Sequence, residues 1–161
     1  MPLVRHQLHC CICLQPPERE HKGELAELIS LWKQKGYLFE QSSDLCVGGF
    51  SHHRLEKYPS PRIYGNHQGG YKVRCRSCRQ NIVSVFSHAV QDWRAGGPRQ
   101  LCCPHCQHEQ ALEKCFFMPP VAFSRAALVL IDVEQAHFSQ EVEQDIQNIV
   151  GTHSIVYRRI G

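Results

Sequence analysis

Four cysteines in the middle of the chain have the residue type and spacing that hold a metal ion. They form two Cys-x-x-Cys pairs, Cys75 with Cys78 and Cys103 with Cys106, separated by 24 residues. Two thiolates two residues apart can both reach one ion at about 2.3 Å, because the turn between them directs backbone N–H groups toward the sulfurs. Two such turns complete a tetrahedral shell and leave no position for water. The spacing therefore predicts one structural Zn²⁺ rather than a catalytic one.

Other arrangements of these thiols stay open from the sequence. The two pairs could instead form two disulfides or remain unliganded. Cys102 could take the place of Cys103, and His105 or His108 could replace one thiolate. The usual spacing of such turns favours Cys103 and Cys106 as the second pair of ligands.

Residues 71–110 resemble the zinc-ribbon or zinc-knuckle modules, and the Cys-Pro-His-Cys turn that ends at Cys106 carries most of the likeness. The sequence departs from the common pattern at Arg79 and Gln107, which follow the second Cys of each pair, where such turns often have Gly. It also departs in the segment between the pairs, whose pattern is typical of a helix. The resemblance implies zinc binding and implies little about function, because such sites occur in nucleic-acid binders, protein adaptors and enzyme subdomains.

The residues around these cysteines form a basic segment. The whole chain has a net charge of +3, but residues 61–110 carry +5 and the other residues −2. A basic surface of this kind attracts anionic partners. The predicted partner-binding residues are Arg74, Arg76, Arg79, Arg94 and Arg99. With Tyr71, Phe86 and Trp93 between them, they could contact phosphates and stack on bases. Alternatively, Phe86 and Trp93 form the core of a small helix whose solvated face holds the arginines.

The hydrophobic pattern outside this segment predicts strand, helix, strand, and then the same order again. This order resembles the ferredoxin-like split βαβ arrangement, an α+β fold with one antiparallel sheet. In that arrangement the first and third strands are central, the second and fourth are edges, and the two long helices cover one face. The expected strands are 4–14, 37–42, 126–134 and 154–160, and the expected helices are 23–35, 84–95 and 140–150, the last with Ser139 as N-cap.

A domain division follows from these elements. With 161 residues, the chain is long enough for one domain with a real core and a small insertion. Residues 1–47 and 111–161 form a split ferredoxin-like domain in this interpretation. Residues 48–70 are rich in Gly, Pro and His and predict a long loop. Residues 71–110 are the zinc-binding insertion.

A second group of thiols lies near the start of the chain. Cys10, Cys11 and Cys13 could form another metal site with Cys46, His9 or His52. On a strand, however, side chains alternate between faces, so only Cys11 and Cys13 share one. We therefore favour buried thiols in a hydrophobic core over a second metal site.

A third candidate site consists of histidines. His52, His53 and His67 fall in the predicted loop, where they could act as acid–base groups or ligands. The sequence contains no nucleophile elbow, phosphate-binding loop or His-Glu-x-x-His motif, so no residue is assigned as catalytic. We favour solvated histidines over an active site.

The first residues lack the apolar run of a secretory signal, and no apolar run approaches the roughly 20 residues that span a bilayer. We therefore expect a cytoplasmic location, where cysteines are more often metal ligands or buried thiols than disulfides.

Together these features predict a non-enzymatic binding module that contains zinc. Its partner is nucleic acid or another protein, contacted through the basic insertion and the adjacent loop. One alternative is an adaptor or protein-neutralising role, similar to that of an immunity protein. Another is an enzyme centred on the His-rich loop.

Overall fold

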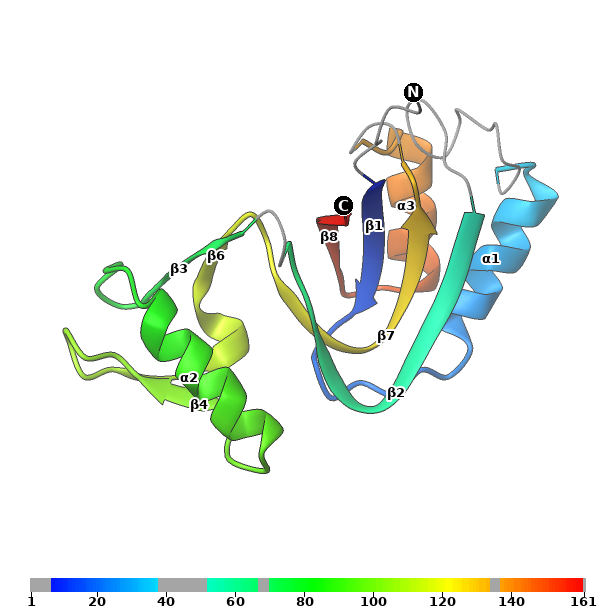
Figure 1. The fold of residues 1–161 in the computed structure, drawn as a ribbon. Helices are drawn as coiled ribbons and strands as arrows, with labels where there is room; N and C mark the ends of the chain where they lie inside the picture. Colours follow the sequence, from blue (N-terminus) through cyan, green and yellow to red (C-terminus); the bar gives the residue numbers. More distant parts are fainter. Residues whose placement is uncertain (1–6, 38–51, 67–69, 134–136, 161) are drawn as a thin grey trace, which may run out of the picture.

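The computed structural model describes residues 7–37, 52–66, 70–133 and 137–160. Two parts lie next to each other in Figure 1. The α/β body contains a four-stranded sheet with two helices, and the cysteine module contains the elements from β3 through β6, residues 72–118. Strand β2 (His52–Tyr64) leads from the body toward the module, and β7 (Ala122–Ile131) returns from the module into the body.

The sheet of the α/β body is antiparallel throughout and has the strand order β2-β7-β1-β8. Strand β1 (Gln7–Leu14) and β7 occupy the centre, and β8 (His153–Ile160) is an edge. The predicted central and outer positions of these three strands are confirmed. Their burial explains the placement, because the side chains from Cys10 to Leu14 and from Ala126 to Leu130 are fully buried, as a strand covered on both faces requires.

The second edge strand differs from the prediction. The expected strand was 37–42, but Tyr37 lies in the turn that follows the first helix, and residues 38–42 lie outside the described part of the chain. The edge is instead β2, a 13-residue strand inside the expected loop of residues 48–70. Its two prolines favoured a loop, yet an edge strand tolerates proline because one side of its backbone has no ladder partner. The register of β2 against β7 shifts between Lys57 and Arg62, around both prolines.

Two helices cover one face of this sheet, as predicted (Figure 1). They are α1 (Glu24–Gln34) and α3 (Gln140–Ile149), and the Ser139 side chain accepts a hydrogen bond from the Val142 N–H as the predicted N-cap of α3. Their apolar sides meet β1 and β7 in one core. The core residues contributed by the helices are Leu25, Leu28, Trp32, Val142 and Ile146.

The cysteine module is built from two short two-stranded sheets, β3–β6 and the β4–β5 hairpin, and a helix. Helix α2 (Val83–Arg94) matches the helix predicted between the cysteine pairs. The module extends past residue 110, because β6 returns to pair with β3 and closes it. Its strands are β3 (Lys72–Arg74), β4 (Gln100–Cys102), β5 (Glu109–Ala111) and β6 (Phe116–Met118), with a short 3-10 helix η1 (Leu112–Lys114) before β6.

The module has a core of its own. Phe86 on α2 is fully buried and meets Tyr71, Phe117 and Phe123 edge-on, with ring centroids 5.3–6.5 Å apart. Phe123 belongs to β7, so this aromatic cluster also anchors the module to the sheet. Phe86 and the partly buried Trp93 thus belong to the core of the module, as the alternative interpretation expects, while the role of the arginines stays a prediction.

Candidate metal centre

The two Cys-x-x-Cys segments fold into the same turn. In the first cysteine turn, residues 75–80, the Arg79 N–H donates to the Cys75 carbonyl at 2.9 Å; in the second, residues 103–108, the Gln107 N–H donates to the Cys103 carbonyl at 2.8 Å. Arg79 and Gln107 have φ angles of 64° and 63°. This left-handed conformation explains why Gly is common at that position in zinc turns.

Backbone N–H groups point at the first sulfur of each turn. The Ser77 N–H donates to Cys75 Sγ at 3.3 Å, and the His105 N–H donates to Cys103 Sγ at 3.4 Å. Such hydrogen bonds stabilise a thiolate over a thiol. Both turns are therefore prepared to bind a cation through their sulfurs.

The four sulfurs of Cys75, Cys78, Cys103 and Cys106 lie within 4.8 Å of one another. Cys75 Sγ is 3.7 Å from Cys106 Sγ, and Cys78 Sγ is 3.6 Å from Cys103 Sγ. Tetrahedral bonds of about 2.3 Å to one ion place sulfurs about 3.8 Å apart. A disulfide needs about 2.05 Å, so this geometry fits a shared metal ion and not two disulfides.

The pKa values of two of these thiols move in opposite directions. Burial raises the pKa of Cys75, but hydrogen bonds from the Cys78 and Ser77 N–H groups and from Gln110 outweigh it and lower the pKa to about 5. The Gln80 N–H lowers the pKa of Cys78, but burial and the neighbouring thiols raise it to about 12. The site therefore favours one ionised cysteine. Ionising the other thiols beside it requires a bound cation that offsets the repulsion between the thiolates.

Gln110 is the residue of this site that the sequence did not indicate. It is buried on β5, and its Nε2 donates to Cys75 Sγ at 3.2 Å while its Oε1 accepts from the Arg76 N–H at 2.9 Å. Gln110 therefore joins the first cysteine turn to the β4–β5 hairpin. Its only sequence signal is its position four residues after Cys106, with the exposed Glu109 before it on the strand.

The alternative ligands do not join this group. Cys102 is exposed, and its thiol lies 3.6 Å from the Gln107 carbonyl oxygen. His105 and His108 are exposed beside the second turn and lie outside the set of ligand atoms close enough to share one ion.

The thiols of β1 are buried in the sheet. Cys11 and Cys13 share the face opposite the helices, and Cys10 lies on the helix face. Burial raises the pKa of Cys11 to about 11 and that of Cys13 well above its ordinary value, so both are protonated near neutral pH. In the described part of the chain, no ligand group besides the four-cysteine group is close enough to hold an ion. Cys46 lies outside the described residues.

Only two of the three candidate histidines lie in the described part of the chain. His52 and His53 are adjacent residues on β2, so their side chains leave opposite faces of the strand. His67 lies outside the described residues.

The predicted partner-binding arginines fall into different environments. Arg74, Arg76 and Arg79 are exposed around the first cysteine turn, and Arg94 is exposed at the end of α2. Arg99 has a side chain only 17% exposed. It pairs with Glu18 at 2.6 Å and Glu113 at 3.1 Å, which neutralise its charge locally.

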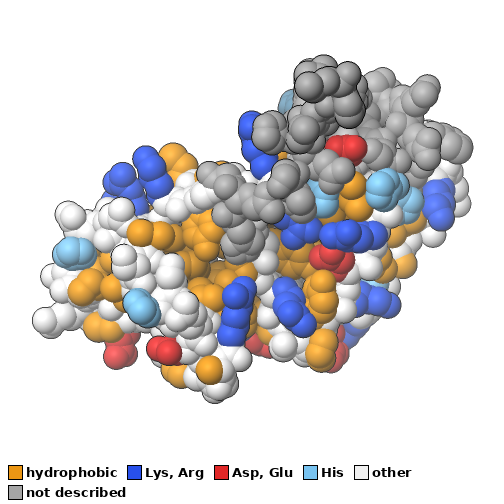
Figure 2. Space-filling model, viewed as in Figure 1, with side chains coloured by type: hydrophobic (Ala, Val, Ile, Leu, Met, Phe, Trp, Pro, Cys, Tyr) orange, Lys and Arg blue, Asp and Glu red, His pale blue; other side chains and the backbone are white. Residues whose placement is uncertain are grey.

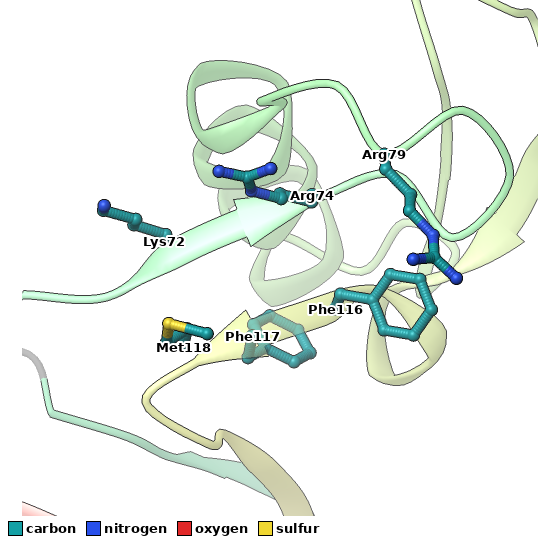
Figure 3. Close-up of a pocket in the computed structure, with 6 residues that line it drawn as sticks. All are labelled: Lys72, Arg74, Arg79, Phe116, Phe117 and Met118. Atoms are coloured by element: carbon teal, nitrogen blue, oxygen red, sulfur yellow. The ribbon is translucent and has the colours of Figure 1, made fainter.

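An open hollow of about 510 Å³ lies beside the first cysteine turn (Figure 3). Its cations come from β3 and the turn, and its apolar side chains come from β6. Figure 2 shows Lys and Arg side chains beside hydrophobic ones at one edge of the module. The lining residues are Lys72, Arg74, Arg79, Phe116, Phe117 and Met118.

In comparisons with known proteins, no family model, curated protein or solved structure matches the chain. Among the helices of the described residues, none is long and apolar enough to cross a membrane.

Proposed function

We propose that this chain is a non-enzymatic binding module that holds one structural zinc ion and contacts an anionic partner, nucleic acid or an acidic protein. The α/β body, in a ferredoxin-like arrangement, is its support, and the cysteine module is its contact surface. Cytoplasmic conditions suit this role, because they keep the thiols reduced.

The choice of zinc rests on the ligands. Four thiolates in a tetrahedron are the commonest donor set of structural zinc. Four protein ligands leave no position for a reactive water, so the ion supplies rigidity and no chemistry to a substrate. The ligands are Cys75, Cys78, Cys103 and Cys106.

One observation carries the choice of contact surface: three exposed arginines surround a turn that the metal would rigidify. Arg74, Arg76 and Arg79 are part of a segment with a net charge of +5 in a chain of +3. Mutual repulsion of these charges gives no stability, whereas cations on a rigid turn lose little conformational entropy on binding an anion. The alternative enzyme receives no such support, since His52 and His53 diverge on one strand.

The proposal is tested by replacing Arg74, Arg76 and Arg79 together with Gln in the zinc-loaded full chain. The matched control replaces three exposed lysines of the body, Lys22, Lys33 and Lys57, with Gln. Both variants lose three charges. We expect the arginine variant to elute from immobilised heparin, a generic polyanion, at much lower salt than the lysine variant. Equal elution of the two variants would show that net charge acts and that the module is not a contact surface.

A further inference from the structure

The two-stranded β3–β6 sheet has an unusual outer face. Cross-strand partners in this sheet are Lys72 with Met118 and Arg74 with Phe116, and all four side chains are exposed. Between these pairs, Val73 of β3 turns inward, where it is fully buried in the module core. Each outward pair therefore joins a cation on one strand to an apolar side chain on the other.

The apolar half of this face is largely exposed to solvent. Met118 is 72% exposed and Phe116 is 41% exposed, and they are two of the three large hydrophobic residues that the described chain leaves exposed. An outward position on a small antiparallel sheet is ordinarily polar. Exposed apolar side chains rimmed by charged ones mark binding surfaces.

The two kinds of side chain form parallel rows, as Figure 3 shows. Lys72 and Arg74 follow β3, about 7 Å apart for residues two positions apart on a strand. Phe116 and Met118 follow β6 beside them. The Arg79 guanidinium closes one end of the hollow, 5.3 Å from the centre of the Phe116 ring. None of the described residues that line the hollow is acidic.

We propose that this hollow binds single-stranded nucleic acid, an inference that rests on the proposed function and names its partner. A single strand has phosphates along one edge and bases along the other, which matches a row of cations beside a row of apolar side chains. Lys72, Arg74 and Arg79 contact the phosphates, while bases stack on Phe116 and pack against Met118. In a duplex the base faces are stacked on each other, so they cannot reach Phe116. An acidic peptide offers the charges but no row of flat faces.

The experiment measures binding of a fluorescent oligothymidine of about 10 nucleotides to the zinc-loaded full chain by anisotropy. We expect Phe116→Ala to weaken binding about tenfold with an unchanged salt dependence, and Phe116→Trp to restore binding. Lys72→Gln with Arg74→Gln should reduce the salt slope by about 0.7 for each lost phosphate contact. The control is Val83→Ala, which removes an exposed apolar side chain from α2 and should leave affinity unchanged.

The outcomes separate this inference from the proposed function. Zinc content and circular dichroism of each variant establish that it is folded. If Phe116→Ala binds oligothymidine as tightly as the parent, or if the duplex or a polyglutamate peptide binds more tightly than the single strand, the inference is overturned. The heparin comparison would still support an anion-binding surface. If the three arginines prove irrelevant to heparin, the proposed function itself fails.

Discussion

The two cysteine turns have the same backbone and different surroundings. Both place a non-glycine residue in the left-handed conformation, Arg79 in the first turn and Gln107 in the second. The first turn is anchored from within, since Cys75 is fully buried and receives the Gln110 amide. In the second turn, Cys103 is equally buried, but Cys106 is exposed where Cys78 of the first turn is half-buried. The two halves of the site therefore differ in the depth of their second cysteine and in the Gln110 amide, while their first cysteines are held alike.

The largest expected effect is a difference between two ligand substitutions. Cys75→Ser removes a buried sulfur that three N–H donors support, so we expect the variant to lose stoichiometric zinc and the module to unfold. Cys106→Ser leaves an exposed position that water can fill, so we expect zinc to be retained with lower affinity. Competition with a coloured chelator measures both affinities. Equal losses in the two variants would contradict the expectation that the buried ligand contributes more than the exposed one.

A smaller effect is expected from the amide beside Cys75. Gln110→Ala removes a hydrogen bond to the sulfur and another to the Arg76 N–H, and the loss of such a partner typically lowers metal affinity about 10- to 100-fold. Gln100→Ala on the neighbouring strand is the control, because that side chain is exposed. The same chelator competition should show a change in the first variant only. An unchanged affinity for Gln110→Ala would reduce this residue to a packing role.

The smallest effect concerns the two left-handed residues. Glycine relieves the strain of a positive φ angle, which costs other residues about 1–2 kcal/mol. The entropy that glycine adds to the unfolded chain offsets part of this gain, so Arg79→Gly and Gln107→Gly should each stabilise the chain by about 0.5–1 kcal/mol. Only Arg79→Gly also removes a cation from the hollow. Thermal unfolding should therefore improve in both, while heparin affinity should fall in the first alone. If affinity falls equally in both, the loss comes from the backbone and not from the guanidinium.

The sequence predicted the elements whose signals are local. The Cys-x-x-Cys spacing indicated the four clustered thiols, and the hydrophobic patterns indicated the central strands and all three helices. The edge strand β2 was not predicted. Pro59 and Pro61 indicate a loop unless the strand is known to lie at the edge of a sheet. Gln110 was not predicted either, because its role depends on a contact with Cys75, 35 residues away. The sequence did not indicate that Phe116 and Met118 form an exposed row, because that row exists only when β6 pairs with β3.

The central claim is that one zinc ion on four cysteines holds the module together, and one measurement tests it directly. Freshly reduced full-length protein is analysed for metal, and hydrogen exchange is then followed by mass spectrometry before and after excess chelator. We expect about one zinc per chain, and faster exchange on chelation in β4 and β5 and in both cysteine turns, with exchange in β1 and β7 unchanged. Metal-free protein with the same protection in both turns would contradict it.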